Sequence, residues 1–328
     1  MEDIFEGKTI LLTGGTGSFG QKFVEMLLKS HNPHSIRVYS RGELKQVEMG
    51  RKFKDEHIRY FIGDVRDRNR LYRAMNGADI VVHAAALKHV PVCEYNPIEA
   101  VNTNINGATN IIDAAIDNEV DRVLALSTDK AVQPVNLYGA TKTVAEKLFI
   151  QANAYSGGRK TKFSCVRYGN VIGSSGSVVP LFLKQKETGE ITITDNDMTR
   201  FWITLEQGAD LVINSINAMK GGEIFVPKIP SMKITDLADL LAPGIKRKII
   251  GIRPGEKLHE VLLTAEEATH TLEFEKYFIV EPEHAFWSSS NHPSGKKCSK
   301  GFSYASNTNK EWLDRQKMEK LLKSQGFI

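Results

Sequence analysis

Short apolar runs alternate with helix-like segments through the first half of the chain. The runs are rich in β-branched residues and lie at residues 9–13, 35–40, 58–62, 80–84, 122–126 and 163–168. Between them, apolar residues recur at helical spacing, as in Phe19, Phe23, Met26 and Leu27. The runs are continuously apolar, which is typical of parallel strands buried on both faces. This order predicts an α/β fold with a doubly wound parallel sheet covered by helices.

The alternation stops near Gly173, where Gly, Ser and Pro cluster as far as Pro180. We therefore predict a large N-terminal domain at residues 1–172 and a smaller α/β lobe at 173–328, with crossings of the chain between them. In the lobe, the pattern predicts helices at 205–219 and 235–241, a strand at 249–252, a polar turn at 253–257 and a helix after that turn.

Three glycines, Gly14, Gly17 and Gly20, lie between the first strand and the first helix. This spacing allows a tight turn, a close backbone approach to a pyrophosphate and close packing of the helix. The amino terminus of the helix then offers free N–H groups to the phosphates. A purely structural turn is the alternative, but the βαβ context favours a Rossmann-type dinucleotide site. The candidate cofactor residues of this turn are Gly14, Thr16, Gly17, Ser18, Phe19 and Gly20.

The end of the second strand indicates which dinucleotide would bind. It reads Tyr39-Ser40-Arg41, with Lys45 one helical turn later. Sites that prefer NAD usually place an acid here, whereas a hydroxyl and two cations suit the 2′-phosphate of NADP. The alternative is that Arg41 and Lys45 are solvated residues at a helix start, and Glu43 keeps NAD open. We expect NADP, held in part by Ser40, Arg41 and Lys45.

The ends of the third and fourth strands offer further cofactor contacts. Asp64 can accept a hydrogen bond from adenine beside the Val65 N–H, or it can cap the next helix, a role that Asp67 fits better. Small residues after the fourth strand let a cofactor lie against the backbone, and His83 fits a packed histidine better than a metal ligand. Lys88, at the same sheet edge, can hold a phosphate or sugar or simply face solvent. The candidates are Asp64, Val65, Ala84, Ala85, Ala86, Lys88 and Asn104.

A cluster of proton-transfer groups follows the fifth apolar run. Thr128, Asp129 and Lys130 lie at the carboxyl end of that strand. Tyr138 and Lys142 are four residues apart, which places them one turn apart on one helix face, where the cation makes the phenol easier to deprotonate. An acid and an amine are more than a simple dehydrogenase needs. The alternative for Asp129 and Lys130 is an ordinary ion pair, which the neighbouring hydroxyl, phenol and amine disfavour.

Polar residues of the second half indicate a polar, anionic substrate. An arginine on the turn at 253–257 suits a diphosphate, because a guanidinium binds phosphate oxygens bidentately. Taken one at a time, such residues are more often on a solvated surface. The candidates for substrate binding are Lys88, Asn170, Ser177, Val178, Thr194, Arg200, Arg253 and Glu256.

Composition narrows the class of protein. With 328 residues, 41% of them hydrophobic and 25% charged, the chain can form a sizeable core. Its net charge of +4 is spread out, and the basic runs at 45–54 and 246–248 lack interleaved aromatics, which disfavours a nucleic-acid partner. The N-terminus does not resemble a signal peptide, and no apolar run has the roughly 20 residues of a membrane helix. Cys93, Cys165 and Cys298 lack metal-like spacing, so we expect a reduced, cytoplasmic protein without a metal site.

The glycine turn that starts at Thr13 and the Tyr138-x-x-x-Lys142 pair resemble the extended short-chain dehydrogenases/reductases. The segment 127–130, Ser-Thr-Asp-Lys, narrows the resemblance to nucleotide-sugar 4,6-dehydratases. Members that retain the configuration at C5 carry Thr-Asp-Glu there. The amine of Lys130 instead resembles the inverting UDP-N-acetylglucosamine 4,6-dehydratases of the pseudaminic-acid pathway, and the tyrosine distinguishes the chain from capsule-pathway relatives that can have Met. The resemblance covers essentially the whole chain except 284–300.

This resemblance implies an NADP-dependent hydro-lyase that converts UDP-N-acetylglucosamine to UDP-2-acetamido-2,6-dideoxy-β-L-arabino-hex-4-ulose and water. Tyr138, aided by Lys142, would take the C4 hydroxyl proton, and Thr128 would form a hydrogen bond with the C4 oxygen. Lys130, whose pKa must then fall, would take the C5 proton, and a protonated Asp129 would donate to the leaving C6 hydroxyl. NADP would be tightly bound and regenerated each cycle. A homo-oligomer is also implied, with a hexamer as one candidate form.

Two other functions stay open at this point. A UDP-sugar 4-epimerase on the same fold needs Tyr138 and Lys142 but has no use for an acid and an amine at 129 and 130. A non-catalytic NADP-binding sensor or scaffold typically lacks the Tyr–Lys pair, which is present here. Whether the sugar decorates a flagellin, a capsule or another polysaccharide is open as well.

Overall fold

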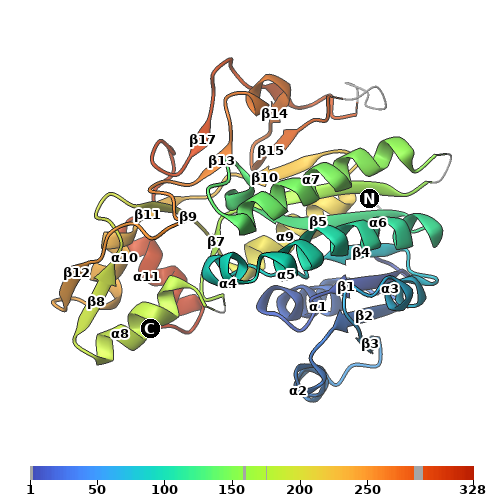
Figure 1. The fold of residues 1–328 in the computed structure, drawn as a ribbon, viewed down its shortest axis with the longest axis horizontal. Coiled ribbons are helices and arrows are strands. Elements are labelled where there is room, and N and C mark those ends of the chain that lie inside the picture. The colour runs from blue at the N-terminus through green and yellow to red at the C-terminus, as the bar shows by residue number, and fades with distance from the viewer. Residues whose placement is uncertain (1–2, 158–159, 175, 284–290) are drawn as a thin grey trace.

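One large sheet organises the structure (Figure 1). The computed structural model describes residues 3–157, 160–174, 176–283 and 291–328. Within these ranges, the sheet contains β1 (Thr9–Thr13), β2 (Ser35–Ser40), β3 (Ile58–Ile62), β4 (Ile80–His83), β5 (Arg122–Thr128), β6 (Lys162–Tyr168), β10 (Ile224–Pro227), β14 (Thr271–Glu273), β15 (Tyr277–Val280) and β16 (Lys296–Lys297). They lie in the order β16-β14-β15-β10-β6-β5-β4-β1-β2-β3. The strands from β3 to β10 pair in parallel, and β15, β14 and β16 add antiparallel pairs at one edge.

The predicted doubly wound α/β fold is confirmed, and each of the six predicted runs is a parallel strand of this sheet. Leu11, Val81 and Val123 share one register across β1, β4 and β5 and are completely buried. Burying a side chain of this size contributes about 1.5–3 kcal/mol, so the apolar runs select these central positions. β5 continues two residues beyond the predicted end, which makes Thr128 its last residue.

Helices cover both faces of the parallel part of the sheet. They are α1 (Ser18–Ser30), α2 (Glu43–Phe53), α3 (Arg68–Met75), α4 (Val90–Tyr95), α5 (Pro97–Val101), the π-helical turn η1 (Asn102–Asn106), α6 (Gly107–Asp117), the 3₁₀ turn η2 (Asp129–Ala131), α7 (Leu137–Tyr155) and α9 (Leu205–Ala218). The 3₁₀ turn η3 (Glu267–His270) contacts the antiparallel strands β14, β15 and β16. α1 packs on α9 against one face, whereas α3, α6 and α7 neighbour one another on the other face (Figure 1). Among the helices of the described ranges, none has the length and apolarity that a membrane crossing requires.

A smaller lobe lies beside the sheet, at the left of Figure 1. It contains β7 (Asn170–Val171), α8 (Val178–Glu187), β8 (Glu190–Ile193), β9 (Thr199–Ile203), β11 (Ser231–Lys233), α10 (Ile234–Leu241), β12 (Lys246–Ile249) and α11 (Arg315–Ser324), while β13 (Val261–Leu263) pairs with β17 (Tyr304–Ala305). The lobe has an apolar core of its own around Phe182, Trp202 and Leu237. Between its elements, the chain returns to the large sheet through α9 and β10 and again through β14–β16.

Two predictions in the lobe were wrong. The expected strand at 249–252 is instead β12, which ends at Ile249, and Ile250 and Ile252 are exposed. The chain leaves the strand because Gly251 has a positive φ of 81°, which breaks the extended backbone. After the polar turn, the chain enters β13 rather than a helix, because pairing with β17 satisfies its backbone groups. The predicted helices at 205–219 and 235–241 are confirmed as α9 and α10.

Candidate active site

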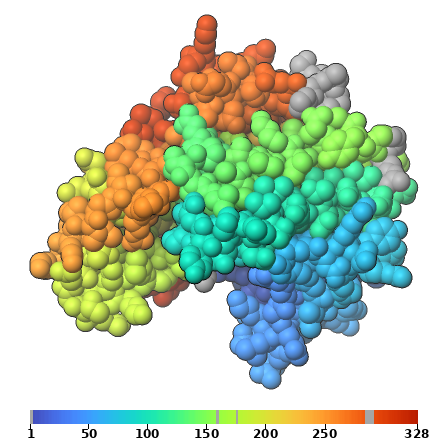
Figure 2. Space-filling model, viewed as in Figure 1, coloured from blue at the N-terminus to red at the C-terminus, as the bar shows by residue number. Residues whose placement is uncertain are grey.

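A cleft of about 1180 Å³ extends from the β1–α1 turn to the lobe. It lies at the carboxyl ends of the parallel strands, at the point where the strand order reverses between β1 and β4. In doubly wound sheets this is the place where ligands bind. Figure 2 shows the lobe, in yellow-green and orange, adjoining the teal and green helices of the sheet domain. All the predicted site residues line the cleft except Asn104 and Asp129.

The glycine turn makes the phosphate end of the cleft. Gly14 has a positive φ of 68°, and a Cβ there would lie 2.9 Å from the backbone nitrogen of Ala85. A Cβ on Gly20 would lie 2.3 Å from the Gly15 carbonyl oxygen, so both positions exclude larger residues. α1 begins at Ser18 without a side-chain cap, which leaves its first N–H groups free for an anion. The residues present therefore fit a dinucleotide pyrophosphate.

The end of β2 presents Ser40, Arg41 and Lys45 to the cleft. Arg41 is more than half exposed, so its guanidinium is accessible to a phosphate. Asp64, the predicted adenine acceptor, already has a partner: its Oδ2 accepts from the Nη2 of Arg66 at 2.7 Å. Burial opposes the charge of Asp64, but its hydrogen bonds with Arg66 outweigh this and lower its pKa. An adenine amino group would share this carboxylate with Arg66.

Asn104 supports the cleft from behind. It is completely buried in the π-helical turn η1, a type of distortion that often occurs at functional sites. Its side-chain amide accepts from the N–H of Leu87, donates to the carbonyl of Leu87 and donates to Thr141 Oγ1, all within 3.0 Å. These bonds fix the loop after β4, which carries Lys88, relative to α7. In this structure, Asn104 therefore positions cleft residues.

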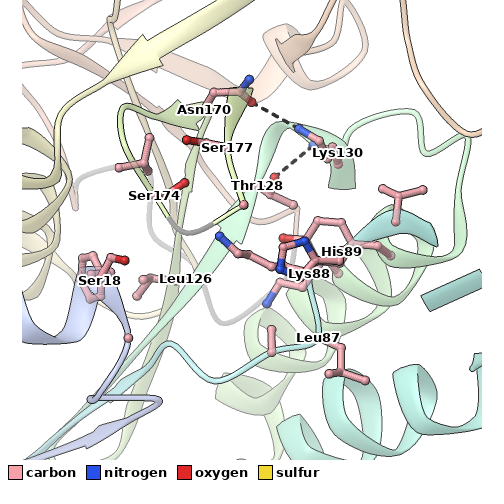
Figure 3. A pocket seen from close by; sticks show the side chains of 18 of the residues that line it. Ser18, Leu87, Lys88, His89, Leu126, Thr128, Lys130, Asn170, Ser174 and Ser177 are labelled. Carbon is pink, nitrogen blue, oxygen red and sulfur yellow. Dashed lines mark hydrogen bonds between the residues drawn. The ribbon is translucent and has the colours of Figure 1, made fainter. Parts of the chain in front are cut away.

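The catalytic candidates meet at the end of β5. Asp129 Oδ1 accepts from Lys130 Nζ at 3.0 Å and from Thr128 Oγ1 at 2.9 Å. Lys130 Nζ also donates to Asn170 Oδ1 at 3.4 Å (Figure 3). Asp129 is fully buried, and its Oδ2 has no hydrogen-bond partner among the described residues. Burial raises the pKa of the Asp129 carboxyl, although Lys130 acts against this shift. The pair can therefore hold a proton on either member.

Tyr138 and Lys142 lie together in the first turns of α7. Asn136 caps this helix by accepting from the N–H of Gly139 at 2.7 Å. Burial raises the pKa of Tyr138 to about 12, and the charge of Lys130, rather than that of Lys142, is the largest influence in the other direction. Burial lowers the pKa of Lys142. In this structure Lys130, and not Lys142, is thus the cation that most favours the phenolate of Tyr138.

Sequence reasoning missed Glu260. Its side chain is 2% exposed, with Oε1 3.5 Å from Lys130 Nζ and 3.6 Å from Arg200 Nε. The expectation that the pKa of Lys130 falls was wrong: burial does lower it, but the carboxylates of Asp129 and Glu260 outweigh burial and raise it. Glu260 lies just before β13, in a segment predicted as a helix, and no local motif marks it.

The substrate candidates divide into accessible and occupied groups. Arg200 donates to the carbonyls of Thr199 and Lys257 at 2.7 and 2.9 Å, so its guanidinium holds the loop before β13. Arg253 is half exposed and lines the cleft, so it is available to a diphosphate. Figure 3 shows Lys88 between the Ser18 end and the Lys130 end of the cleft. The other candidates that line the cleft are Asn170, Ser177, Val178, Thr194 and Glu256.

No group of three or more His, Cys, Asp and Glu side chains suited to a metal occurs in the described part of the chain.

Known proteins share this architecture and sequence. Residues 10–282 match the family of polysaccharide biosynthesis proteins. The chain belongs to this family. It is 52% identical, over 99% of its length and all of the relative's, to the UDP-N-acetylglucosamine 4,6-dehydratase (inverting) of Campylobacter jejuni. This identity confirms the resemblance inferred from the motifs.

Other members of the family widen the comparison. Over 84% of each chain, the protein is 43% identical to a UDP-glucose 4-epimerase of Rickettsia akari. The X-ray structure of Pen from Bacillus thuringiensis superposes with a TM-score of 0.92 at 40% identity, and covers 99% of this chain and 100% of that one. The relatives of the chain are therefore named for two different reactions of nucleotide sugars.

Proposed function

We propose that this chain removes water from UDP-N-acetylglucosamine across C5 and C6, with inversion at C5, to give UDP-2-acetamido-2,6-dideoxy-β-L-arabino-hex-4-ulose. The observation that carries the proposal is the pair at the end of β5, where a buried acid and a partly buried amine lie 3.0 Å apart beside Tyr138. The 52% identity to the inverting Campylobacter jejuni enzyme supports the substrate and the stereochemistry. The enzyme is a lyase.

The cofactor of this reaction is NADP. A bound nicotinamide would accept a hydride from C4 and supply one to C6. The glycine turn and the start of α1 would hold its pyrophosphate, and Ser40, Arg41 and Lys45 its 2′-phosphate. Lys142 and Tyr138, which line the cleft near the catalytic pair, would hold its other end. Support for NADP over NAD comes from the two cations at the end of β2.

Tyr138 acts first, as the base for the C4 hydroxyl. Its phenol must lose its own proton before substrate oxidation, and burial opposes this loss. The positive charge of Lys130 and the hydrogen bond with Thr128 favour the phenolate. Oxidation at C4 then leaves the hydroxyl proton on Tyr138. The resulting ketone acidifies the proton at C5.

Asp129 and Lys130 perform the elimination. An ionised pair and a neutral pair hold the same number of protons, and one transfer across the 3.0 Å hydrogen bond interconverts them. In the neutral pair, the Lys130 amine takes the C5 proton while Asp129 gives its proton to the leaving C6 hydroxyl. The same transfer afterwards restores acid and base. After hydride transfer to C6, C5 gains one proton from the opposite face, and Tyr138 gives up the proton that it took from the C4 hydroxyl. The proton count of the enzyme is therefore unchanged after one cycle.

A second candidate is a UDP-sugar 4-epimerase, which the 43% identity to the Rickettsia akari relative favours. That reaction returns the hydride to C4 and uses Tyr138 alone as acid and base. It leaves a buried carboxyl and a lysine without a task. Mass spectrometry separates the two candidates, because an epimerase product is isomeric with the substrate and a dehydratase product has lost one water.

The deciding experiment is an incubation with UDP-N-acetylglucosamine and NADP in heavy water. We expect loss of one water, one deuterium at C5 and the L-configured ketone by NMR. An isomeric product would sink the dehydratase proposal, whereas a D-configured ketone would overturn only the role of Lys130 in inversion. A protein that binds NADP and turns nothing over would instead be a sensor or scaffold.

We further infer the setting of the reaction from the resemblance. The product would enter pseudaminic-acid synthesis in the cytoplasm, for flagellin glycosylation or another surface polysaccharide. Residues 1–172 would bind NADP, and 173–328 would mainly bind the substrate. The protein would be a homo-oligomer, with a hexamer as one candidate, which light scattering on the purified protein tests.

A further inference from the structure

Glu260 is a buried carboxylate to which the mechanism above gives no task. Its backbone is fixed, because its N–H donates to Ser306 Oγ at 2.9 Å and its carbonyl accepts from the N–H of Ser306 at 2.8 Å. Its side chain lines the cleft and extends to Lys130 and Arg200. Its second oxygen, Oε2, is buried without a hydrogen-bond partner within the described residues. A buried carboxylate of this kind is costly, which calls for a physical reason.

The charged groups around Lys130 come from several elements. Two are carboxylates: Asp129 in η2 and Glu260 before β13. Three are cations that repel it: Arg200 in β9, Lys257 in the loop before β13 and Lys88 in the loop after β4. The phenol of Tyr138 in α7 feels its charge as well. Without Glu260, three cations would face the Asp129–Lys130 pair with no second negative charge to offset them.

We propose that Glu260 is a positioning residue: its carboxylate, held beside Arg200, holds the Lys130 side chain and keeps one proton on the Asp129–Lys130 pair at neutral pH. The proposal rests on the proposed function, which needs one shared proton in that pair. Glu260 follows Lys130 by 130 residues in the chain. Its contact with Lys130 therefore links the segment before β13 to the end of β5.

The direction of the effect follows from charge. A carboxylate near both members of the pair favours the protonated form of each, so Glu260 raises the pKa of Asp129 and that of Lys130. The range of pH over which the pair holds one proton is therefore displaced upward at both ends. Neutralising Glu260 moves both limits to lower pH. The Glu260 carboxylate acts on Lys130 from 3.5 Å and raises the pKa of Asp129 as well, so the displacement should be large enough to measure at both limits.

Infrared difference spectroscopy of the full-length enzyme without substrate measures this directly. The stretching band of a protonated carboxyl is followed against pH, and Asp129→Asn identifies the band that belongs to Asp129. We expect Glu260→Gln, which has nearly the same shape, to lose this band at a measurably lower pH than the wild type. Glu260→Asp keeps the charge, so its Asp129 band is expected to titrate close to the wild-type pH.

The matched control is Glu223→Gln, which neutralises another fully buried glutamate, hydrogen-bonded to Ser164. Its Asp129 band is expected to titrate as in the wild type. An unchanged titration in Glu260→Gln would overturn the proposal. So would an equal shift in Glu260→Asp or in Glu223→Gln, because either would indicate altered packing.

A second pair of variants covers the case in which Glu260→Gln does not fold. Lys130→Met removes the ammonium, so Lys130→Met/Glu260→Gln leaves no buried cation at 130 unpaired. We expect the Asp129 band of the double variant to titrate at lower pH than that of Lys130→Met, and equal titrations would again overturn the proposal. Because no substrate is present, the result is independent of whether the enzyme releases water from UDP-N-acetylglucosamine.

Discussion

The two ends of the cleft are built in opposite ways. At the phosphate end, the β1–α1 turn offers backbone N–H groups to a ligand. It can form because Gly14 and Gly20 have no Cβ that would meet the neighbouring backbone. At the catalytic end, the site consists of the buried carboxyl groups of Asp129 and Glu260 and the partly buried amine of Lys130. The first end depends on the conformation of a few consecutive residues. The second depends on the distances between groups that the fold brings together from far apart.

This difference has an energetic side. The glycine turn buries no charge, so folding it costs mainly backbone entropy. The catalytic end buries two carboxyl groups, which is tolerated because they lie next to the partly buried ammonium of Lys130. Substitutions at the catalytic end should therefore change protonation and rate, whereas substitutions at the phosphate end should change shape and affinity. Five predictions test this contrast.

The largest expected effect is that of Asp129→Asn on dehydration. The amide cannot give a proton to the leaving C6 hydroxyl, so the rate of water loss should fall about 10²- to 10⁴-fold, with NADP affinity kept. Mass spectrometry of the product and a fluorescence titration of NADP measure the two quantities. Asp121→Asn, at the opposite end of β5, is the matched control and should keep the rate. If Asp129→Asn also lost NADP affinity, the two ends of the cleft would not be independent, and the contrast would be contradicted.

The next effect concerns the ion pair beneath α7. Arg167 donates to Glu146 at 2.7 Å and to Glu267 at 3.0 Å, and both Arg167 and Glu146 are buried. Arg167→Met should lower the free energy of unfolding by about 3–5 kcal/mol, because it leaves buried carboxylates unpaired. Denaturant titration measures it. Lys246→Met, which breaks the exposed pair with Glu190, should cost no more than about 1 kcal/mol.

The same variant carries a pH dependence. Burial opposes the charge of Glu267, but Arg167 outweighs it and lowers its pKa below the ordinary value of 4.5. A depressed pKa stabilises the fold above the unfolded value and loses this contribution as the pH falls through the folded value. The gap in stability between wild type and Arg167→Met should thus be full at neutral pH and narrow below about pH 4.5. A gap that widens in acid would contradict the pairing.

Gly14→Ala tests the shape of the phosphate end. Its new methyl would meet the Ala85 backbone at 2.9 Å, in addition to the strain of a positive φ. Gly189→Ala is the matched control, because Gly189 has a similar φ of 77° but open space around it. We expect Gly14→Ala to be less stable than the control by about 1–3 kcal/mol and to bind NADP more weakly. Equal thermal stability and equal NADP affinity of the two variants would show that the close contact between position 14 and the Ala85 backbone does not matter.

The smallest effect is the choice of cofactor. Arg41→Ser should weaken NADP binding about tenfold, by the loss of one charge-assisted contact, and leave NAD binding unchanged. Arg51→Ser, in the last turn of α2, removes a similar charge away from the cleft and should change neither affinity. Isothermal titration with both dinucleotides measures the ratio. An equal loss for NAD and NADP would mean that Arg41 does not contact the 2′-phosphate.

Predictions from the sequence succeeded where interactions between neighbouring residues decide the structure, and failed where residues distant in the chain decide it. The parallel strands, the glycine turn and the grouping of Thr128, Lys130 and Tyr138 after the fifth strand could be predicted. Each depends on apolar runs or spacings within a few consecutive residues. The strand expected at 249–252 was not, because β12 depends on its partner β8 and on where Gly251 turns the chain away. Arg200 was a candidate for substrate binding, yet its guanidinium donates to the carbonyls of Thr199 in β9 and Lys257 in the loop before β13.

By itself, the sequence determined which backbone segments form the parallel sheet, where the phosphate turn lies and that an acid, an amine and a phenol gather after β5. Only the tertiary structure decided the protonation of that cluster. The carboxylates of Asp129 and Glu260 together raise the pKa of Lys130, and the packing of β13 on β17 brings that of Glu260 to within 3.5 Å of Lys130 Nζ. The physical reason is that charge acts through space, so the pKa of a group depends on neighbours that its own stretch of sequence does not contain.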